Sequence, residues 1–173
     1  DSNSPLRNAA MHYFTSGFIE EGNKATDLLL KQLKLPNPIN RVGLIVRLLL
    51  NISTLRIRWL FRKFTSYKTN AVFEERANTL IDLAYGLGSI DPIRSSYFIL
   101  RACRICLAGA GPAVTSRSFA IEAAYVASVG RSMTKLSRQY LNFAMKEAMR
   151  SQDDYAQMHC SLVSAITHYL LSN

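Results

Sequence analysis

Apolar side chains recur three and four residues apart along most of this chain, which is the spacing of one face of an α-helix. Ala25, Leu28, Leu29 and Leu33, for example, fall on a single face. Glycine and proline are scarce and stand between the periodic segments, where helices are expected to end. The pattern predicts eight helices, over residues 5–17, 19–33, 41–64, 71–86, 92–108, 112–129, 133–150 and 153–171. Their short connections leave no room for a sheet, so the predicted fold class is all-α.

One segment, 41–64, could be a strand as well as a helix. Leu55, Ile57 and Trp59 alternate with arginines, as in a half-buried strand. However, no glycine or proline stands between Gly43 and Gly86, and a second set of apolar residues is spaced by three and four. This set consists of Leu44, Leu48, Ile52, Leu55 and Trp59. We therefore predict one long helix here, capped by Asn40.

Positive charge is concentrated in the same part of the chain. The net charge is +9, and nine basic residues but no acidic one stand between Asp27 and Glu74. Outside this stretch 12 basic residues (21 minus 9) balance 12 acidic ones. The excess predicts an acidic partner. The candidate docking residues are Arg47, Arg58, Arg62 and Lys63.

The basic helix 41–63 has three interpretations. Its arginines could contact nucleic-acid phosphates, with salt-dependent affinity. Alternatively, Trp59, Phe61 and Phe64 could lie at a membrane surface, with the arginines toward anionic lipid. The third interpretation is a core helix whose arginines follow an exposed edge and pair with acidic residues of a partner. We favour it over nucleic acid and membrane, because the apolar residues cover more than half of the circumference, which suits burial on two sides.

Composition and cysteine usage narrow the class of protein. A chain of 173 residues that is 49% hydrophobic can bury a sizeable core, which excludes disorder as its main state. The longest uncharged run within 42–64 is Leu48–Leu55, well short of the ~20 residues that a spanning helix needs. Three cysteines without a secretory segment favour a reducing, cytoplasmic compartment. The chain opens with Asp1 and closes while a helix still runs, which suggests a piece of a longer protein.

No residue pattern predicts catalysis, a cofactor or a metal. Cys103, Cys106, His159 and Cys160 include the residue types of a zinc site. The Cys-x-x-Cys pair falls in mid-helix instead of a tight turn, however, which favours buried cysteines. The histidines are scattered over both ends of the chain, and no catalytic-triad signature joins them.

Residues 118–151 form a predicted helix–turn–helix with the length of one tetratricopeptide repeat. Ala124, Leu141 and Ala144 match its small and large apolar positions, although the signature Gly and Tyr of the first helix are absent. The last predicted helix lacks its partner. We therefore expect an α-solenoid of tetratricopeptide-like helix pairs, truncated at the C-terminus. The apolar face of its last helix would be exposed and could form an artificial dimer.

A more specific likeness lies in residues 84–130. They contain Gly86-Leu87, then Ile90-Asp91-Pro92-Ile93-Arg94, an aromatic residue at Phe98, and Ala120-x-Glu122-Ala123-Ala124. These features resemble a segment of large multidomain bacterial serine/threonine protein kinases, in which a kinase domain and an AAA-type ATPase module precede a tetratricopeptide-like region. The likeness extends from about residue 10 to the end. It implies a regulatory, cytoplasmic role. Kinase and nucleotide-binding motifs are absent from the sequence itself.

Asp91-Pro92-Ile93-Arg94 is interpreted as a structural motif. Asp91 can accept N–H groups from the first helical turn, and Pro92 suits the first helical position. We expect Arg94 to form an ion pair with Glu122 across the helix pair.

The sequence thus predicts a non-catalytic interaction or regulatory module for a protein or peptide partner, which includes other domains of the same chain. Its parts are an N-terminal helix pair (1–35), a linker with the long basic helix (36–70) and tetratricopeptide-like pairs (71–173). The alternative is a nucleic-acid-binding helical domain of a bacterial regulator that uses helix 41–63.

Overall fold

The computed structural model describes residues 4–37, 40–61 and 69–172, and within these ranges the chain is helical and contains no β-strand. The all-α prediction is therefore confirmed, and the predicted helices are all present, with small differences at their ends. The helices are α1 (Ser4–Thr15), α2 (Ile19–Gln32), α3 (Arg41–Phe61), α4 (Ala71–Leu87), α5 (Pro92–Cys106), α6 (Pro112–Ser128), a short 3₁₀ turn η2 (Arg131–Met133), α7 (Thr134–Ser151) and α8 (Asp154–Ser172).

Two helices begin at the polar side chains that the sequence predicts as caps. The Asn40 side chain accepts a hydrogen bond from the Val42 backbone N–H at 3.1 Å, where α3 starts. Asp91 accepts from the Arg94 backbone N–H at 3.0 Å, and Pro92 occupies the first position of α5. The predicted capping roles of Asn40, Asp91 and Pro92 are thus confirmed.

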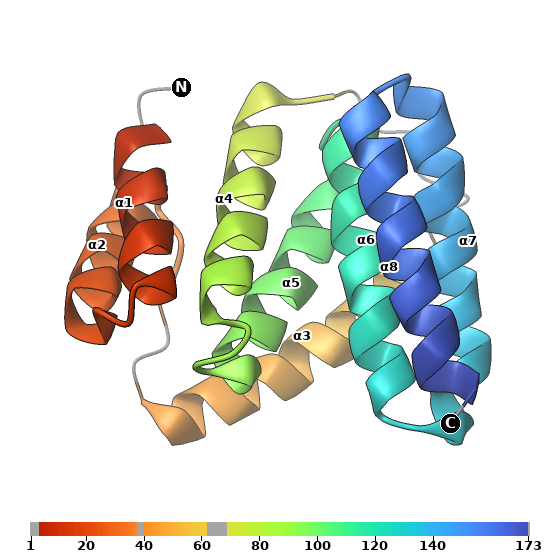
Figure 1. Ribbon diagram of the computed structural model, residues 1–173, viewed down its shortest axis with the longest axis horizontal. Helices are drawn as coiled ribbons and strands as arrows, with labels where there is room; N and C mark the ends of the chain where they lie inside the picture. Colours follow the sequence, from red (N-terminus) through yellow and green to blue (C-terminus); the bar gives the residue numbers. More distant parts are fainter. Residues whose placement is uncertain (1–3, 38–39, 62–68, 173) are drawn as a thin grey trace.

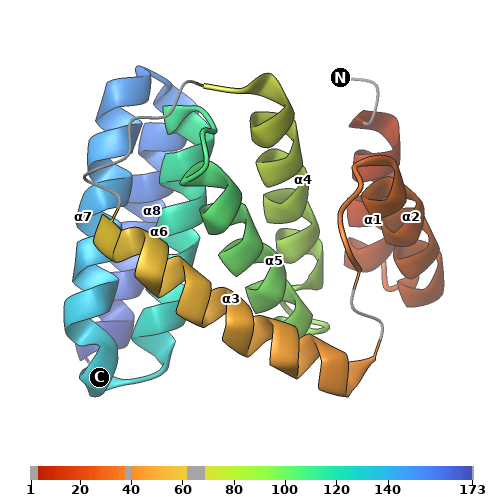
Figure 2. The same cartoon turned by 180° about the vertical axis from the view of Figure 1, so that it is seen from behind.

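The helices form a row of antiparallel pairs (Figure 1). α1 packs on α2, α4 on α5, and α6 on α7, while α8 packs on both α6 and α7. Neighbouring pairs meet through α1 with α4 and through α5 with α6. The exception is α3, which runs obliquely across the back of this row and packs mainly on α5 (Figure 2).

Phe14 joins the first helix pair to the second. Its side chain is buried and lies between Gly22 on α2 and Gly86 on α4. A Cβ atom at Gly22 would be only 2.7 Å from the Phe14 ring, so a larger residue would force the two helices apart. The close approach of α1, α2 and α4 therefore depends on these two glycines.

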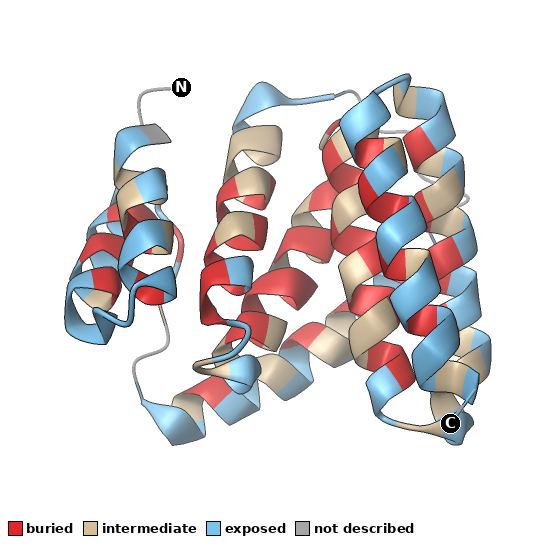
Figure 3. Ribbon diagram, in the orientation of Figure 1, coloured by how far each residue is buried: buried red, intermediate tan, exposed pale blue. Residues whose placement is uncertain are grey.

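The core follows the middle of the row (Figure 3). Its largest group of aromatic side chains lies where α3 meets α6 and α7. Trp59, on α3, is 4.7 Å from Tyr140, 5.1 Å from Phe143 and 5.4 Å from Phe119, measured between ring centroids. The contacts with Tyr140 and Phe143 are edge-on, and such pairs add to the stabilisation that burial gives. Through Trp59 the C-terminal end of α3 is fixed to helices that come much later in the chain.

Candidate binding surfaces around helix α3

The predicted docking residues lie on α3 or just beyond it. Arg47 and Arg58 are both exposed and fall on the same stripe of the helix, three turns apart. The Arg58 Nη1 donates a hydrogen bond to the Arg104 carbonyl oxygen of α5 at 3.3 Å, so this arginine also ties α3 to its neighbour. Arg62 and Lys63 lie outside the described residues.

The prediction that α3 is buried on two sides is wrong for this chain. Leu44, Leu55 and Trp59 are buried against the row of helices, which lies on one side of α3 only. The opposite side carries eight large apolar side chains that are 48 to 71% exposed, and we name this surface the α3 outer face. It consists of Val42, Ile45, Val46, Leu49, Leu50, Ile57, Leu60 and Phe61.

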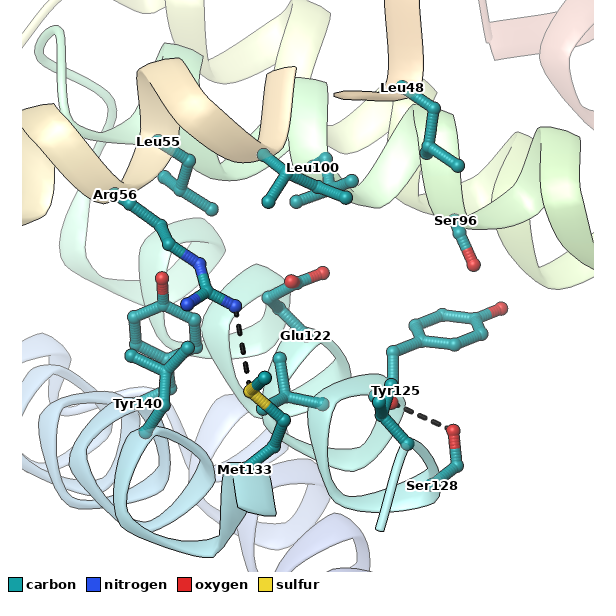
Figure 4. Close-up of a pocket in the computed structure, with 14 residues that line it drawn as sticks. Leu48, Leu55, Arg56, Ser96, Leu100, Glu122, Tyr125, Ser128, Met133 and Tyr140 are labelled. Atoms are coloured by element: carbon teal, nitrogen blue, oxygen red, sulfur yellow. Dashed lines mark hydrogen bonds between the residues drawn. The ribbon is translucent and has the colours of Figure 1, made fainter. Parts of the chain in front are cut away.

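Glu122 lies in a cavity of about 350 Å³ under one edge of α3 (Figure 4). Leu48 and Leu55 of α3 and Leu100 of α5 line this cavity, and Arg56 extends into it from α3. Glu122 is 6% exposed, and its carboxyl has no hydrogen-bond or ion-pair partner among the described residues. Burial raises its pKa to about 8, although Arg56 acts in the opposite direction.

The predicted ion pair between Arg94 and Glu122 is not formed. The guanidinium of Arg94 instead donates to the Asn23 side-chain oxygen at 2.6 Å and to that of Asn37 at 3.0 Å. Arg94 belongs to the first turn of α5, which faces α2, whereas Glu122 faces α3. Burial lowers the pKa of Arg94, and the carboxylates of Asp27 and Asp91 oppose this shift. The role of Arg94 is to join α5 to α2 and the segment after it.

A second cavity, of about 290 Å³, lies under the opposite edge of α3 and was not predicted. Cationic side chains from four segments line it, and we name it the basic cavity. They are Lys34, Arg58, Arg76, Arg101 and Arg104. The only sequence signal is the spacing of three between Arg101 and Arg104, which places both on one side of α5.

The three cysteines are buried and free, as predicted. Burial raises the pKa of the Cys106 thiol to about 11 and shifts that of Cys103 upward as well. His159 is paired with the Tyr85 hydroxyl, and burial lowers its pKa to about 4. Over residues 4–37, 40–61 and 69–172, no three His, Cys, Asp or Glu side chains group as a metal site requires.

Helices of the described ranges are all too short or too polar to cross a membrane. The chain was compared with protein-family models, with curated proteins and with solved structures, and none of the three comparisons found a match.

Proposed function

We propose that this chain is a non-catalytic helical interaction module, and that its α3 outer face binds a helix of a protein partner with acidic residues at its edge. The observation that carries this proposal is the exposure of eight large apolar side chains on one side of α3. Apolar patches of this kind mark interaction surfaces in soluble proteins. A helix with apolar residues on two opposite sides is suited to lie between two layers of protein.

Charge selects the kind of partner. Arg41, Arg47 and Arg58 are exposed on α3, and no acidic residue stands between Asp27 and Glu74. Complementary charges around an apolar contact speed association and exclude wrong partners. An amphipathic helix with Asp or Glu along its margin would meet both requirements.

The row of helix pairs supports a tetratricopeptide-like solenoid, with α3 as an inserted transverse helix. Within this proposal, the likeness to the helical region of bacterial serine/threonine kinases makes other domains of such a protein the first partners to test. The function would be regulatory: a partner bound at α3 would change the activity of the parent protein, while this module itself catalyses no reaction.

Site-specific photo-crosslinking in cells tests the proposal. A photoreactive phenylalanine analogue at Leu49 is expected to give discrete protein adducts, which mass spectrometry identifies. The matched control position is Leu28 on α2, which is 57% exposed against 58% for Leu49. Arg47→Glu should reduce the Leu49 adduct. Identical adducts from both positions, or adducts to lipid or nucleic acid alone, would overturn the proposal.

A further inference from the structure

The basic cavity gathers five cations without an acidic counterpart. Lys34 follows α2, Arg58 lies near the end of α3, Arg76 belongs to α4, and Arg101 and Arg104 belong to α5. None of the described residues that line the cavity is acidic, and the remaining ones are apolar. These apolar residues are Leu35, Phe73, Ile105 and Ala108. The charge and the apolar wall together define the chemistry of an occupant.

Three of the guanidinium groups are held by groups of the fold. Arg101 donates from Nη1 to the Tyr97 hydroxyl at 3.1 Å, and Arg104 donates from Nη1 to the Asn51 side-chain oxygen. Tyr97 and Asn51 are 1% and 4% exposed, so both anchors are fixed by packing. Arg58 is tied to the Arg104 carbonyl oxygen. Each bond uses one nitrogen of its guanidinium and leaves other donors for a ligand.

Within the described part of the chain, three of the arginines that line the cavity also have an unpaired Nε–H group. The Nε atoms of Arg76, Arg101 and Arg104 are removed from solvent and have no hydrogen-bond partner among the described residues. An unpaired buried donor costs stability, and a bound acceptor would remove that cost. Burial and the nearby charges of Arg58 and Arg101 also lower the pKa of Arg104.

Lys34 adds the fifth cation at a conformational cost. Its φ of 54° is left-handed, the conformation for which helix ends generally use glycine. The Lys34 N–H bonds to the Lys31 carbonyl oxygen and the Leu35 N–H to the Leu30 carbonyl oxygen, which closes α2 with a Schellman-type turn.

We propose that the basic cavity binds a small molecule with two or more linked phosphate groups. Arginine matches phosphate oxygens with two parallel hydrogen bonds, and five cations suit a ligand with several negative charges. Phe73 and Ile105 provide an apolar wall for the rest of the ligand. Four segments of the chain line the cavity, and its volume of about 290 Å³ suits a small ligand better than a nucleic-acid strand. This site does not include the α3 outer face and shares only Arg58 with the function proposed above, so triphosphate binding can be tested separately from partner binding.

Calorimetric titration of the whole chain with inorganic triphosphate tests the proposal. We expect one saturable site with a Kd below ~100 μM at about 100 mM salt. Arg76→Gln and Arg101→Gln should each weaken binding by about tenfold or more, because each removes a charge-assisted contact. Arg138→Gln is the matched control, since Arg138 is exposed on α7 and its loss changes the net charge equally. It should alter the Kd by less than about twofold.

Two further measurements keep the result decisive. Nitrogen-15 spectra should show the Nε–H resonances of Arg76, Arg101 and Arg104 shifting as triphosphate is added, which also reports that the variants fold. ATP should bind at the same site with the same sensitivity to Arg101→Gln. Equal losses in Arg138→Gln, or no saturation up to ~1 mM triphosphate, would overturn the proposal. It would also fail if a single-stranded oligonucleotide displaced triphosphate at a lower phosphate concentration than ATP.

Discussion

The two cavities beside α3 are covered by the same pair of helices and have opposite chemistry. Arg56 lines the cavity of Glu122, and Arg58 lines the basic cavity. Residues two apart on a helix point to nearly opposite sides, so neighbouring arginines of one sequence stretch reach different neighbours. Arg56 lies in the same cavity as the buried carboxyl of Glu122, whereas Arg58 lies in the same cavity as four other cations. The charge of a surface is thus set by what each edge of α3 faces, more than by the basic excess of the sequence.

The charged groups of the two cavities also differ in how they are accommodated away from solvent. Glu122 can keep its proton, because burial raises its pKa to about 8, and the neutral form needs no counter-charge. Arginine stays charged in proteins, so the basic cavity requires solvent, salt or a bound anion. We therefore expect the first cavity to respond to pH and the second to ionic strength and ligands.

Trp59→Ala should have the largest effect, because it removes the anchor of the helix that covers both cavities. Loss of a buried aromatic side chain costs about 3–5 kcal/mol of unfolding free energy. Chemical denaturation followed by circular dichroism measures this loss. Leu60→Ala is the control, since Leu60 is 71% exposed, and its effect should stay within about 0.5 kcal/mol. Equal losses for the two variants would show that α3 is not fixed by its aromatic contacts.

Glu122→Gln should change how the stability of the chain depends on pH, because, among the described residues that line the two cavities, only the first cavity contains a carboxyl. The carboxyl has a pKa of about 8 in the folded chain against an ordinary value of 4.5, so the folded state binds more protons between these values. The contribution of Glu122 to stability is complete below pH 4.5, and it is lost as the pH rises from there through the folded-state pKa of about 8. We would measure the free energy of unfolding of both proteins from pH 5 to 9. The value of the variant relative to that of the wild type should increase with pH, by on the order of 2–4 kcal/mol at pH 9. A constant difference across this range would mean that Glu122 is ionised throughout.

Lys34→Gly should stabilise the chain and impair the basic cavity at once. Glycine adopts the left-handed conformation of this position without strain, so we expect a gain of about 1 kcal/mol. The same change removes a cation and should weaken triphosphate binding. Thermal unfolding and calorimetry measure the two effects on one sample. A variant that is more stable and binds triphosphate with an unchanged Kd would show that Lys34 does not contribute to the binding site.

Salt should produce the smallest effect. Added sodium chloride screens the repulsion among the arginines of the basic cavity, so the wild type should gain about 0.5 kcal/mol between low and high salt. Arg101→Gln should gain less, while Glu122→Gln should gain as much as the wild type. Denaturation curves at two salt concentrations and constant pH provide the comparison. An equal gain in Arg101→Gln would place the repulsion elsewhere in the molecule.

Helix positions could be predicted from the sequence because their signals are local. Asn40, Asp91 and Pro92 mark helix starts within a single turn, and the structure confirms these caps. The helical interpretation of α3 was also correct, since apolar spacing over the whole of Arg41–Phe61 outweighs a short alternation. Such features depend only on neighbours in the chain.

The sites could not be predicted in the same way. The basic cavity takes Lys34, Arg58, Arg76 and Arg101 from four separate segments, and only the packing of these segments in the fold brings them together. The proposed pairing of Arg94 with Glu122 failed for the same reason. Opposite charges on successive helices do not reveal which way each helix is turned, and Arg94 is turned toward Asn23 and Asn37.

The position of Trp59 also bears on how the molecule folds. It is the only tryptophan in the chain, and its ring contacts Phe119, Tyr140 and Phe143, which lie on α6 and α7, beyond two intervening helices. Hairpins such as α4 with α5 form from local contacts, whereas closing so long a loop is slower. Tryptophan fluorescence therefore reports the docking of α3, and circular dichroism reports the helices themselves. A fluorescence phase that lags behind the dichroism signal during refolding would identify α3 as the last helix to join the fold.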